Sequence, residues 1–330
     1  MASGDVINYT IRPAKCVERR IIRDELFRIN KFSNLSDYKY IGFGSKYFSD
    51  FSLFHRTLHI NDMVSIEKEV DNEVKYSFNK PFDCIDLRIG HSNEVLSTIQ
   101  FDKRVIAWLD YDYGIDITML TDLQIILESM HSGTFVIISY NSVPHKIGSL
   151  KAEFKNEEGS HKELLIEKLK KTVTEDFVPL DIPENGLSKP EVFSKIVKSI
   201  FDIKISHILS EKNAALPEEE RWSYSQIMYY HYKDGADMGT IGWVFYRNGD
   251  ESDISRCGFE SSEFYSENEP CKISIPNLTI KELNALLNVM PLRGGHHEVS
   301  LPDGVFEQED IDRFAKIYKY YPTFVNGDFF

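Results

Sequence analysis

The chain has 330 residues and a formal net charge of −14, with 42% hydrophobic and 27% charged residues. This composition is that of an ordinary globular protein with a substantial core, and no apolar run is long enough to span a bilayer. The negative charge argues against a protein that coats nucleic acid, because neutralising phosphates provides most of that affinity. Four scattered cysteines, Cys16, Cys84, Cys257 and Cys271, indicate neither a zinc site nor a disulfide framework, so we expect a cytoplasmic protein with no membrane anchor.

The first segment is basic and is predicted to be helical. Apolar residues at helical spacing predict a helix from about Ala14 to Ile29, with Pro13 in the first turn, where proline is tolerated. Its basic residues are Arg12, Lys15, Arg19, Arg20, Arg23, Arg28 and Lys31. Such a run is usually a solvated helix face. The alternative is that one or two of these side chains, with Lys15 as the best candidate, hold an anion.

The stretch 38–67 has the order strand, glycine turn, helix, strand, acid. A short strand at Tyr40-Ile41 runs into Gly42-Phe43-Gly44-Ser45, a helix is expected over 47–58, and a strand over Met63–Ile66 ends on Glu67. Glycines let a backbone bend sharply and approach a ligand, and an acid at the next strand end accepts hydrogen bonds from a ribose. Because Tyr47 stands at the place of the third glycine, the stretch indicates adenosine-bearing ligands in general rather than NAD in particular.

The next two predicted strands lead into polar loops. A third strand, Cys84–Ile89, is followed by Gly90-His91-Ser92, and a fourth, Arg104–Leu109, delivers the run Asp110-Tyr111-Asp112-Tyr113. Open α/β sheets bind ligands at the carboxyl ends of their strands, so we expect these acids and tyrosines near the reaction. The alternative is that Asp112 caps the next helix and that the tyrosines only pack.

The remaining elements complete the sheet and add helices. A helix over 122–131 and a strand over 134–140 close a parallel core with right-handed crossovers, and strands over 225–232 and 238–246 form an antiparallel hairpin. Between them lies a stretch rich in lysine and glutamate, with helices predicted over 161–171 and 190–209. We therefore expect a basic helical segment (1–37), a Rossmann-like core (38–145), a helical insertion (146–220), the closing hairpin of the core sheet (221–250) and a C-terminal module (251–330).

The C-terminal module is predicted to be small and largely helical. After a polar stretch over 247–270 and a short strand over 272–275, Thr279 begins a helix, with Glu282 at capping-box spacing, and a second helix spans 308–320. We expect this module to act as a substrate lid or a dimer contact. The pair His296-His297 invites a metal interpretation, but adjacent strand residues point to opposite faces, so we predict no metal site there.

Taken together, these motifs resemble class I S-adenosylmethionine-dependent methyltransferases and, more narrowly, a bacterial family of O-methyltransferases. The narrower likeness rests on Arg12-Pro13-Ala14-Lys15, Glu18-Arg19, the GFGS turn with Phe48-Ser49-Asp50-Phe51, Ser65-Ile66-Glu67 and Asn79-Lys80-Pro81-Phe82. The resemblance implies an α/β fold: a Rossmann-like class I methyltransferase sheet with helices on both faces and an antiparallel final hairpin. It also implies S-adenosylmethionine as the cofactor.

The resemblance assigns roles to particular residues. The cofactor-binding candidates are Lys15 for the carboxylate, Gly42, Phe43, Gly44 and Ser45 around the methionine part, Glu67 for the ribose, Gly90, His91 and Ser92 for the adenine, and Asp110, which would face the reacting centre. The alternative for His91 is an exposed loop residue without a ligand. The catalytic candidates are Asp110, Asp112 and His55, because a hydroxyl acceptor must lose its proton to a base; His55 could equally be a helix residue facing the core. Metal-dependent relatives carry Asp-Asn after the fifth strand, where this chain has Tyr140-Asn141, so no metal is expected.

The predicted function is methyl transfer from S-adenosylmethionine to an oxygen of a small-molecule or other unidentified acceptor. A second hypothesis is a non-catalytic module that binds S-adenosylmethionine or another nucleotide and acts through a protein partner or as a homodimer in a bacterial multi-gene system. It is motivated by the basic helix and the charged insertion. A third is RNA methylation, which needs the basic residues to touch phosphate. The proline-containing loop of amino-methylating DNA enzymes is not matched at residues 110–113.

Overall fold

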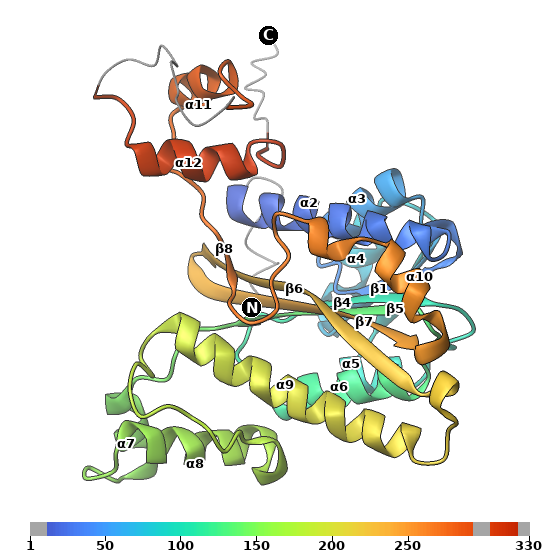
Figure 1. The fold of residues 1–330 in the computed structure, drawn as a ribbon, viewed down its shortest axis with the longest axis vertical. Coiled ribbons are helices and arrows are strands. Elements are labelled where there is room, and N and C mark those ends of the chain that lie inside the picture. Colours follow the sequence, from blue (N-terminus) through green and yellow to red (C-terminus); the bar gives the residue numbers. More distant parts are fainter. Residues whose placement is uncertain (1–11, 293–303, 323–330) are drawn as a thin grey trace.

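The computed structural model describes residues 12–292 and 304–322, and an eight-stranded sheet runs through its middle (Figure 1). The strands are β1 (Lys39–Gly42), β2 (Asp62–Glu67), β3 (Ile85–Ile89), β4 (Val105–Asp110), β5 (Thr134–Asn141), β6 (Trp222–Asp234), β7 (Ala236–Arg247) and β8 (Cys271–Ile273). Their order is β3-β2-β1-β4-β5-β7-β6-β8. The first five strands are parallel, β7 is antiparallel to both β5 and β6, and β8 adds to β6 in parallel.

Helices cover both faces of the sheet (Figure 1). One face carries α2 (Pro13–Arg28), α3 (Ser49–Leu58), α4 (Glu73–Asn79) and α10 (Glu251–Arg256); the other carries α5 (Ser92–Leu96), α6 (Ile117–Glu128) and α9 (Pro190–Asn213), with α7 (Ile147–Phe154) and α8 (His161–Val173) on the same side. Each face has its own hydrophobic cluster, so the sheet is the common wall of two cores.

The central strands are buried on both faces, which explains their composition. In β4, Ile106 and Trp108 pack on the α2 side while Ala107 and Leu109 pack on the α6 side, and all four are buried. A strand covered on both faces has no solvent side, so it shows a continuous apolar run instead of alternation. That is why the fourth and fifth strands could be recognised from the sequence as short apolar runs.

The predicted core elements are confirmed to within a few residues, and the differences are local. Helix α6 is capped by Asp116, whose side chain accepts the N–H groups of Thr118 and Met119. The alternative in which Asp112 caps that helix is therefore wrong. The helices α4, α7 and α10 were not predicted; with six to eight residues each they are too short to show a clear helical period.

The C-terminal module contains α11 (Ile280–Leu287) and α12 (Gln308–Ile317), which share a small third cluster formed by Leu283, Leu286 and Phe314. The predicted capping box is confirmed, because Thr279 accepts the Glu282 N–H and the Glu282 carboxylate accepts the Thr279 N–H. The pair His296-His297 lies outside the described residues. The five-part division of the chain stays a prediction. In the described ranges, no helix has an apolar stretch long enough to cross a membrane.

Candidate functional site

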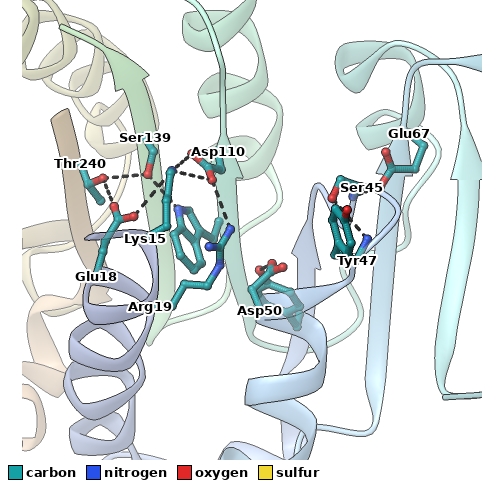
Figure 2. A network of polar contacts seen from close by, with 12 residues as sticks. Lys15, Glu18, Arg19, Ser45, Tyr47, Asp50, Glu67, Asp110, Ser139 and Thr240 are labelled. Carbon is teal, nitrogen blue, oxygen red and sulfur yellow. Dashed lines mark hydrogen bonds and ion pairs between the residues drawn. The ribbon is translucent and has the colours of Figure 1, made fainter. Parts of the chain in front are cut away.

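The glycine turn and the acid predicted to follow it meet at the carboxyl edge of the sheet. Strands β1 and β2 are neighbours, with Gly42 opposite Ser65. The Gly44 N–H donates to Ser65 Oγ (3.1 Å), the Ser65 hydroxyl donates to Glu67 Oε1 (3.0 Å), and the Ser45 N–H donates to the same oxygen (2.7 Å). This set of contacts, which we call the cradle, consists of residues 42–45 with Ser65 and Glu67. Figure 2 shows Ser45 and Glu67 facing each other across it.

Glycine is required in the cradle by close packing. A Cβ on Gly44 would lie 2.5 Å from the Phe48 ring and 2.6 Å from Ser65 Oγ, closer than any real carbon contact. The turn also places Ser45 (φ 48°) and Phe48 (φ 47°) in the left-handed region, which L-residues adopt rarely. Strained backbone of this kind is concentrated at functional sites. Glycine at position 44 therefore allows the turn to pack directly against Phe48 and Ser65.

Glu67 is the titratable group of the cradle. Its side chain is buried, and burial raises the pKa of the carboxyl to about 7, although the hydrogen bonds from Ser65 and Ser45 act in the opposite direction. Burial penalises the charged form, whereas donated hydrogen bonds favour it. Glu67 thus changes charge near neutral pH, and a ligand that donates hydrogen bonds to it would favour the carboxylate.

The loop after β3 lies directly beside the cradle. Glu67 is opposite Ile89 in the sheet, and the Gly90 N–H donates to the Glu67 carbonyl oxygen (2.9 Å). His91 is exposed at the start of α5 and makes no side-chain cap, while Ser92 is half-buried. The structure therefore brings the predicted adenine loop next to the predicted ribose acid.

Asp110, at the end of β4, is held by two cations from the N-terminal helix (Figure 2). The Lys15 amine lies 2.9 Å from both carboxylate oxygens of Asp110, and Arg19 Nη2 lies 3.7 Å from Oδ2. Burial alone would lower the pKa of Lys15, but Asp110, Tyr232 and Glu18 together outweigh it, and the pKa is raised well above its ordinary value. Lys15 is therefore a buried, charged amine within a tight ion pair.

Two further carboxyl groups belong to the same buried network. A directed chain of hydrogen bonds runs from Trp108 Nε1 to Ser139 Oγ (3.0 Å), from Ser139 to Thr240 Oγ1 (2.8 Å), and from Thr240 to Glu18. Since Thr240 donates its one proton to Glu18, it accepts the proton of Ser139, and the chain ends on Glu18 as acceptor. Burial raises the pKa of Glu18, and Lys15, 3.6 Å away, opposes that shift.

Asp50 is the second of these carboxyl groups. It accepts a hydrogen bond from the buried Tyr40 hydroxyl of β1. Burial raises the pKa of Asp50, while the charge of Arg19 opposes that shift. Arg19 thus lies between Asp50 and Asp110, as Figure 2 shows.

The expectation of a solvated basic helix face is wrong for the residues that matter most. Lys15 and Arg19 are buried, and the anion they contact is the protein's own Asp110. Glu18, Arg19 and Asp50 were not predicted as site residues. All three stood in the motifs that carried the family resemblance, but only the fold shows that residues so far apart in sequence converge.

The other two catalytic candidates, Asp112 and His55, lie at different ends of the sheet strands. Asp112 is exposed on the loop after β4, close in sequence to Asp110. His55 lies at the opposite edge of the sheet: its Nδ1 is 3.0 Å from the carbonyl of Ile60, which precedes β2, and it packs on Phe82, which precedes β3. A cavity of about 460 Å³ lies at that edge and is lined by His55 and residues 80–84. His55 is not brought together with the cradle.

Within the described ranges, no group of three or more His, Cys, Asp or Glu side chains is placed to hold a metal ion. The Asn141 side chain, at the end of β5, instead accepts the Val143 N–H (2.9 Å). Asn141 therefore stabilises the turn that follows its own strand.

The strand order, the antiparallel β7 between β5 and β6, and a glycine turn at the carboxyl end of β1 define a class I methyltransferase fold, as the sequence predicted. The chain belongs to the family described as "Putative O-methyltransferase", which matches residues 7–329. The predicted fold class and family are confirmed. None of the curated protein sequences matches this chain.

Solved structures with a similar fold are distant in sequence. Trm1 from Pyrococcus horikoshii, in complex with S-adenosyl-L-methionine, has 12% identity and a TM-score of 0.44 over 72% of this chain and 57% of its own. An O-methyltransferase from Bacillus cereus with SAH has 14% identity and a TM-score of 0.33 over 68% and 80%. A probable spermidine synthase from Corynebacterium glutamicum has 11% identity and a TM-score of 0.33 over 37% and 47%, so the chain spans about half of its length. Similarity at this level assigns no activity.

Proposed function

We propose that the protein transfers the methyl group of S-adenosylmethionine to an oxygen atom of an acceptor, with a small molecule as the simplest acceptor. The observation that carries this proposal is the cradle, in which the strand-end acid Glu67 is hydrogen-bonded to the backbone of the glycine turn. The description of the family supports oxygen as the accepting atom.

The residues fit the parts of this cofactor. The backbone of the turn over 42–45 would lie under the methionine part, Glu67 would accept the ribose hydroxyls, and the loop over 90–92, which adjoins Glu67, would meet the adenine. Lys15 and Asp110 place a positive and a negative charge side by side. An α-amino acid group carries the same pair of charges, so its carboxylate would bind Lys15 and its ammonium would bind Asp110.

When bound, the cofactor supplies an activated methyl group on a sulfonium. The protein must then align the acceptor and exclude water, because the transfer is an in-line displacement. An acceptor hydroxyl must also lose its proton. We assign proton removal to Asp112, because its side chain is exposed on the loop after β4, where an acceptor can reach it.

The test is isothermal titration of the purified protein with S-adenosylmethionine, S-adenosylhomocysteine, NAD and ATP. We expect binding of the first two and none of the others, and a folded Glu67→Ala variant should bind at least tenfold more weakly because it loses a charged hydrogen-bond acceptor. Unchanged affinity in that variant, or binding of NAD alone, would refute the proposal. Transfer of a labelled methyl group to a small-molecule extract then identifies the acceptor.

A non-catalytic module that acts with a protein partner or as a homodimer is the second candidate. It is favoured by the engagement of Asp110 in a buried ion pair, which leaves Asp112 as the only exposed carboxylate among residues 110–113. Tight cofactor binding with no labelled product, together with a stoichiometric protein that co-purifies, would support it. A labelled small-molecule product would exclude it.

RNA methylation keeps less support, because two of the seven basic residues that suggested it, Lys15 and Arg19, are buried in the site. Absence of tRNA binding at low salt would remove it. We also propose a cytoplasmic location in a bacterial cell, which the free state of all four cysteines supports, since reducing compartments keep thiols unpaired.

A further inference from the structure

A second cavity lies where α2 meets the C-terminal module, and its volume is about 300 Å³. It is lined by Pro13 of α2, by residues 275–278 of the chain that follows β8, by Ile280 and Leu283 of α11, and by Tyr321 after α12. Among the described residues that line it, none carries a charge, and only an asparagine and a tyrosine have polar side-chain atoms. We call this cavity the module pocket.

The module pocket is built at the same edge of the sheet as the glycine turn and Asp110. Strand β6 runs in the direction of β4 and β5, because β7 is antiparallel to both of its neighbours, and β8 is parallel to β6. The chain therefore leaves β8 at Ile273 on the carboxyl edge, enters the pocket lining two residues later and passes the start of α2 (Figure 1). Open α/β sheets bind their ligands at this edge.

The first turn of α2 connects the pocket with the buried ion pair. Pro13 lines the pocket, and Lys15, two positions later, places its amine 2.9 Å from Asp110 and 5.4 Å from the centre of the Tyr232 ring. Tyr232 in turn pairs with Ile273, the last residue of β8. The wall of the pocket and the predicted reaction centre thus share one helical turn.

We propose that the module pocket binds the apolar body of the methyl acceptor, and that this acceptor is a small, uncharged hydroxyl compound. This inference rests on the proposed function and adds the chemical class of the acceptor and a role for the C-terminal module. The volume of the pocket is at the lower end of the range for small-molecule sites, so it suits a small molecule rather than a helix or a protein segment.

The lining selects the acceptor by charge and by polarity. A charged group that leaves water for a cavity without a counter-charge loses hydration that nothing replaces, so carboxylates, phosphates and ammonium groups are disfavoured. Apolar surface, in contrast, gains free energy on burial in proportion to its area. The wall formed by Tyr321 is held to α2, because Arg20 donates to the Tyr321 carbonyl oxygen (2.9 Å). The pocket is therefore suited to an uncharged and largely apolar molecule.

The experiment titrates the protein with 2-naphthol and with 6-hydroxy-2-naphthoate at pH 7, both with saturating S-adenosylhomocysteine and without it. The two compounds share a ring system and a hydroxyl, but only the second is charged at this pH. The wild-type protein should bind 2-naphthol at least tenfold more tightly. Absence of 2-naphthol binding, or equal affinity for the two compounds, overturns the inference.

Ile280→Asp tests the position of the site. Ile280 is 60% exposed and is the first residue of α11, where an acid stabilises a helix, so the variant should fold. Its carboxylate adds an uncompensated charge to the pocket wall, and the affinity for 2-naphthol should fall at least tenfold while that for S-adenosylhomocysteine is unchanged. Leu278→Asp should act in the same way. Val305→Asp, an exposed apolar position of the module outside the lining, is the matched control and should keep the wild-type affinity. Unchanged 2-naphthol affinity in folded Ile280→Asp and Leu278→Asp overturns the inference.

Methyl transfer then tests the pocket as the acceptor site. With labelled S-adenosylmethionine and a small-molecule cell extract, the product should pass into an apolar solvent at pH 7, and Ile280→Asp should lower its yield at least tenfold. Label that stays in the aqueous phase, or an equal yield from Ile280→Asp, overturns the inference and leaves the proposed function standing. Binding of 2-naphthol that depends on Ile280, in a protein that does not bind S-adenosylhomocysteine, would instead refute the proposed cofactor and support the ligand class of the pocket.

Discussion

Glu67 shows how one residue can serve the folded chain and its ligand in opposite ways. Burial raises its pKa to about 7, so the empty site favours the protonated form at slightly acidic pH. Ribose hydroxyls, in contrast, donate to the carboxylate. Ligand binding and proton binding therefore compete at this side chain, and the competition should be measurable near neutral pH.

The first prediction concerns affinity. S-adenosylmethionine should bind up to about 50-fold more weakly at pH 5 than at pH 7, because the ligand must displace a proton from Glu67. Titration calorimetry across this range measures the effect. Glu67→Gln should bind weakly with little dependence on pH, and a variant that kept the wild-type slope would exclude Glu67 as the source.

The second prediction concerns stability in the absence of ligand. Because the folded-state pKa of Glu67 is raised, the folded protein binds more protons than the unfolded chain between about pH 4.5 and 7. The Glu67 contribution is therefore fully present at low pH and is lost as pH rises to 7. Relative to the wild-type protein, Glu67→Gln should gain up to about 3 kcal/mol in free energy of unfolding between pH 5 and pH 8. Urea denaturation at the two pH values tests this, and an equal difference at both would contradict it.

The third prediction concerns the buried ion pair. Lys15→Ala leaves Asp110 and Glu18 without their nearest compensating charge in a buried site, so the free energy of unfolding should fall by about 3 kcal/mol. Lys103→Ala is the matched control, because Lys103 pairs with Asp62 on the surface and should contribute less than about 1 kcal/mol. An equal decrease in the free energy of unfolding of the two variants would mean that burial does not strengthen the contribution of the Lys15 pair.

At the scale of elements, the glycine turn requires a residue without a side chain at position 44. Gly44→Ala should abolish or greatly weaken cofactor binding, since its Cβ would meet Phe48 and Ser65 at distances that force the turn open. In Gly148→Ala, on helix α7, the new Cβ meets nothing within 4 Å, and the change should leave binding intact and the stability equal or slightly higher. Calorimetry and thermal unfolding of both variants test this prediction, and cofactor binding by Gly44→Ala at wild-type affinity would contradict it.

The elements also show what the sequence can and cannot predict. Strands such as β4 and β5 are continuous apolar runs, and the cradle has a local order of strand, turn and acid, so both could be predicted. The buried ion pair could not, because Lys15 and Asp110 are 95 residues apart and a basic run on a helix does not reveal which face is covered. His55 was misplaced for the same reason: the sequence shows a histidine on a helix but not which edge of the sheet it reaches.

At the scale of the whole molecule, Arg20 of α2 attaches the residues that follow α12 to the body. Arg20 donates to the carbonyl oxygens of Tyr320 (3.1 Å) and Tyr321 (2.9 Å), and Tyr320 packs on Phe264. Arg20→Ala should loosen this attachment and speed proteolytic cleavage in the connection over 274–279. Arg23→Ala, whose side chain contacts the neighbouring Asp24, should not. Limited proteolysis followed by mass spectrometry measures the difference, and equal cleavage in both variants would contradict this role of Arg20.

The position of α2 has a consequence for how the protein is made. Glu18 of this helix receives its hydrogen bond from Thr240, which is 222 residues later in the chain. At about 5 to 20 residues per second, a ribosome needs roughly 10 to 40 seconds to bridge that interval. Throughout it, Glu18 lacks its Thr240 donor, whereas Asp110, the partner of Lys15, has already been synthesised, so the buried network is completed only after β7 joins the sheet.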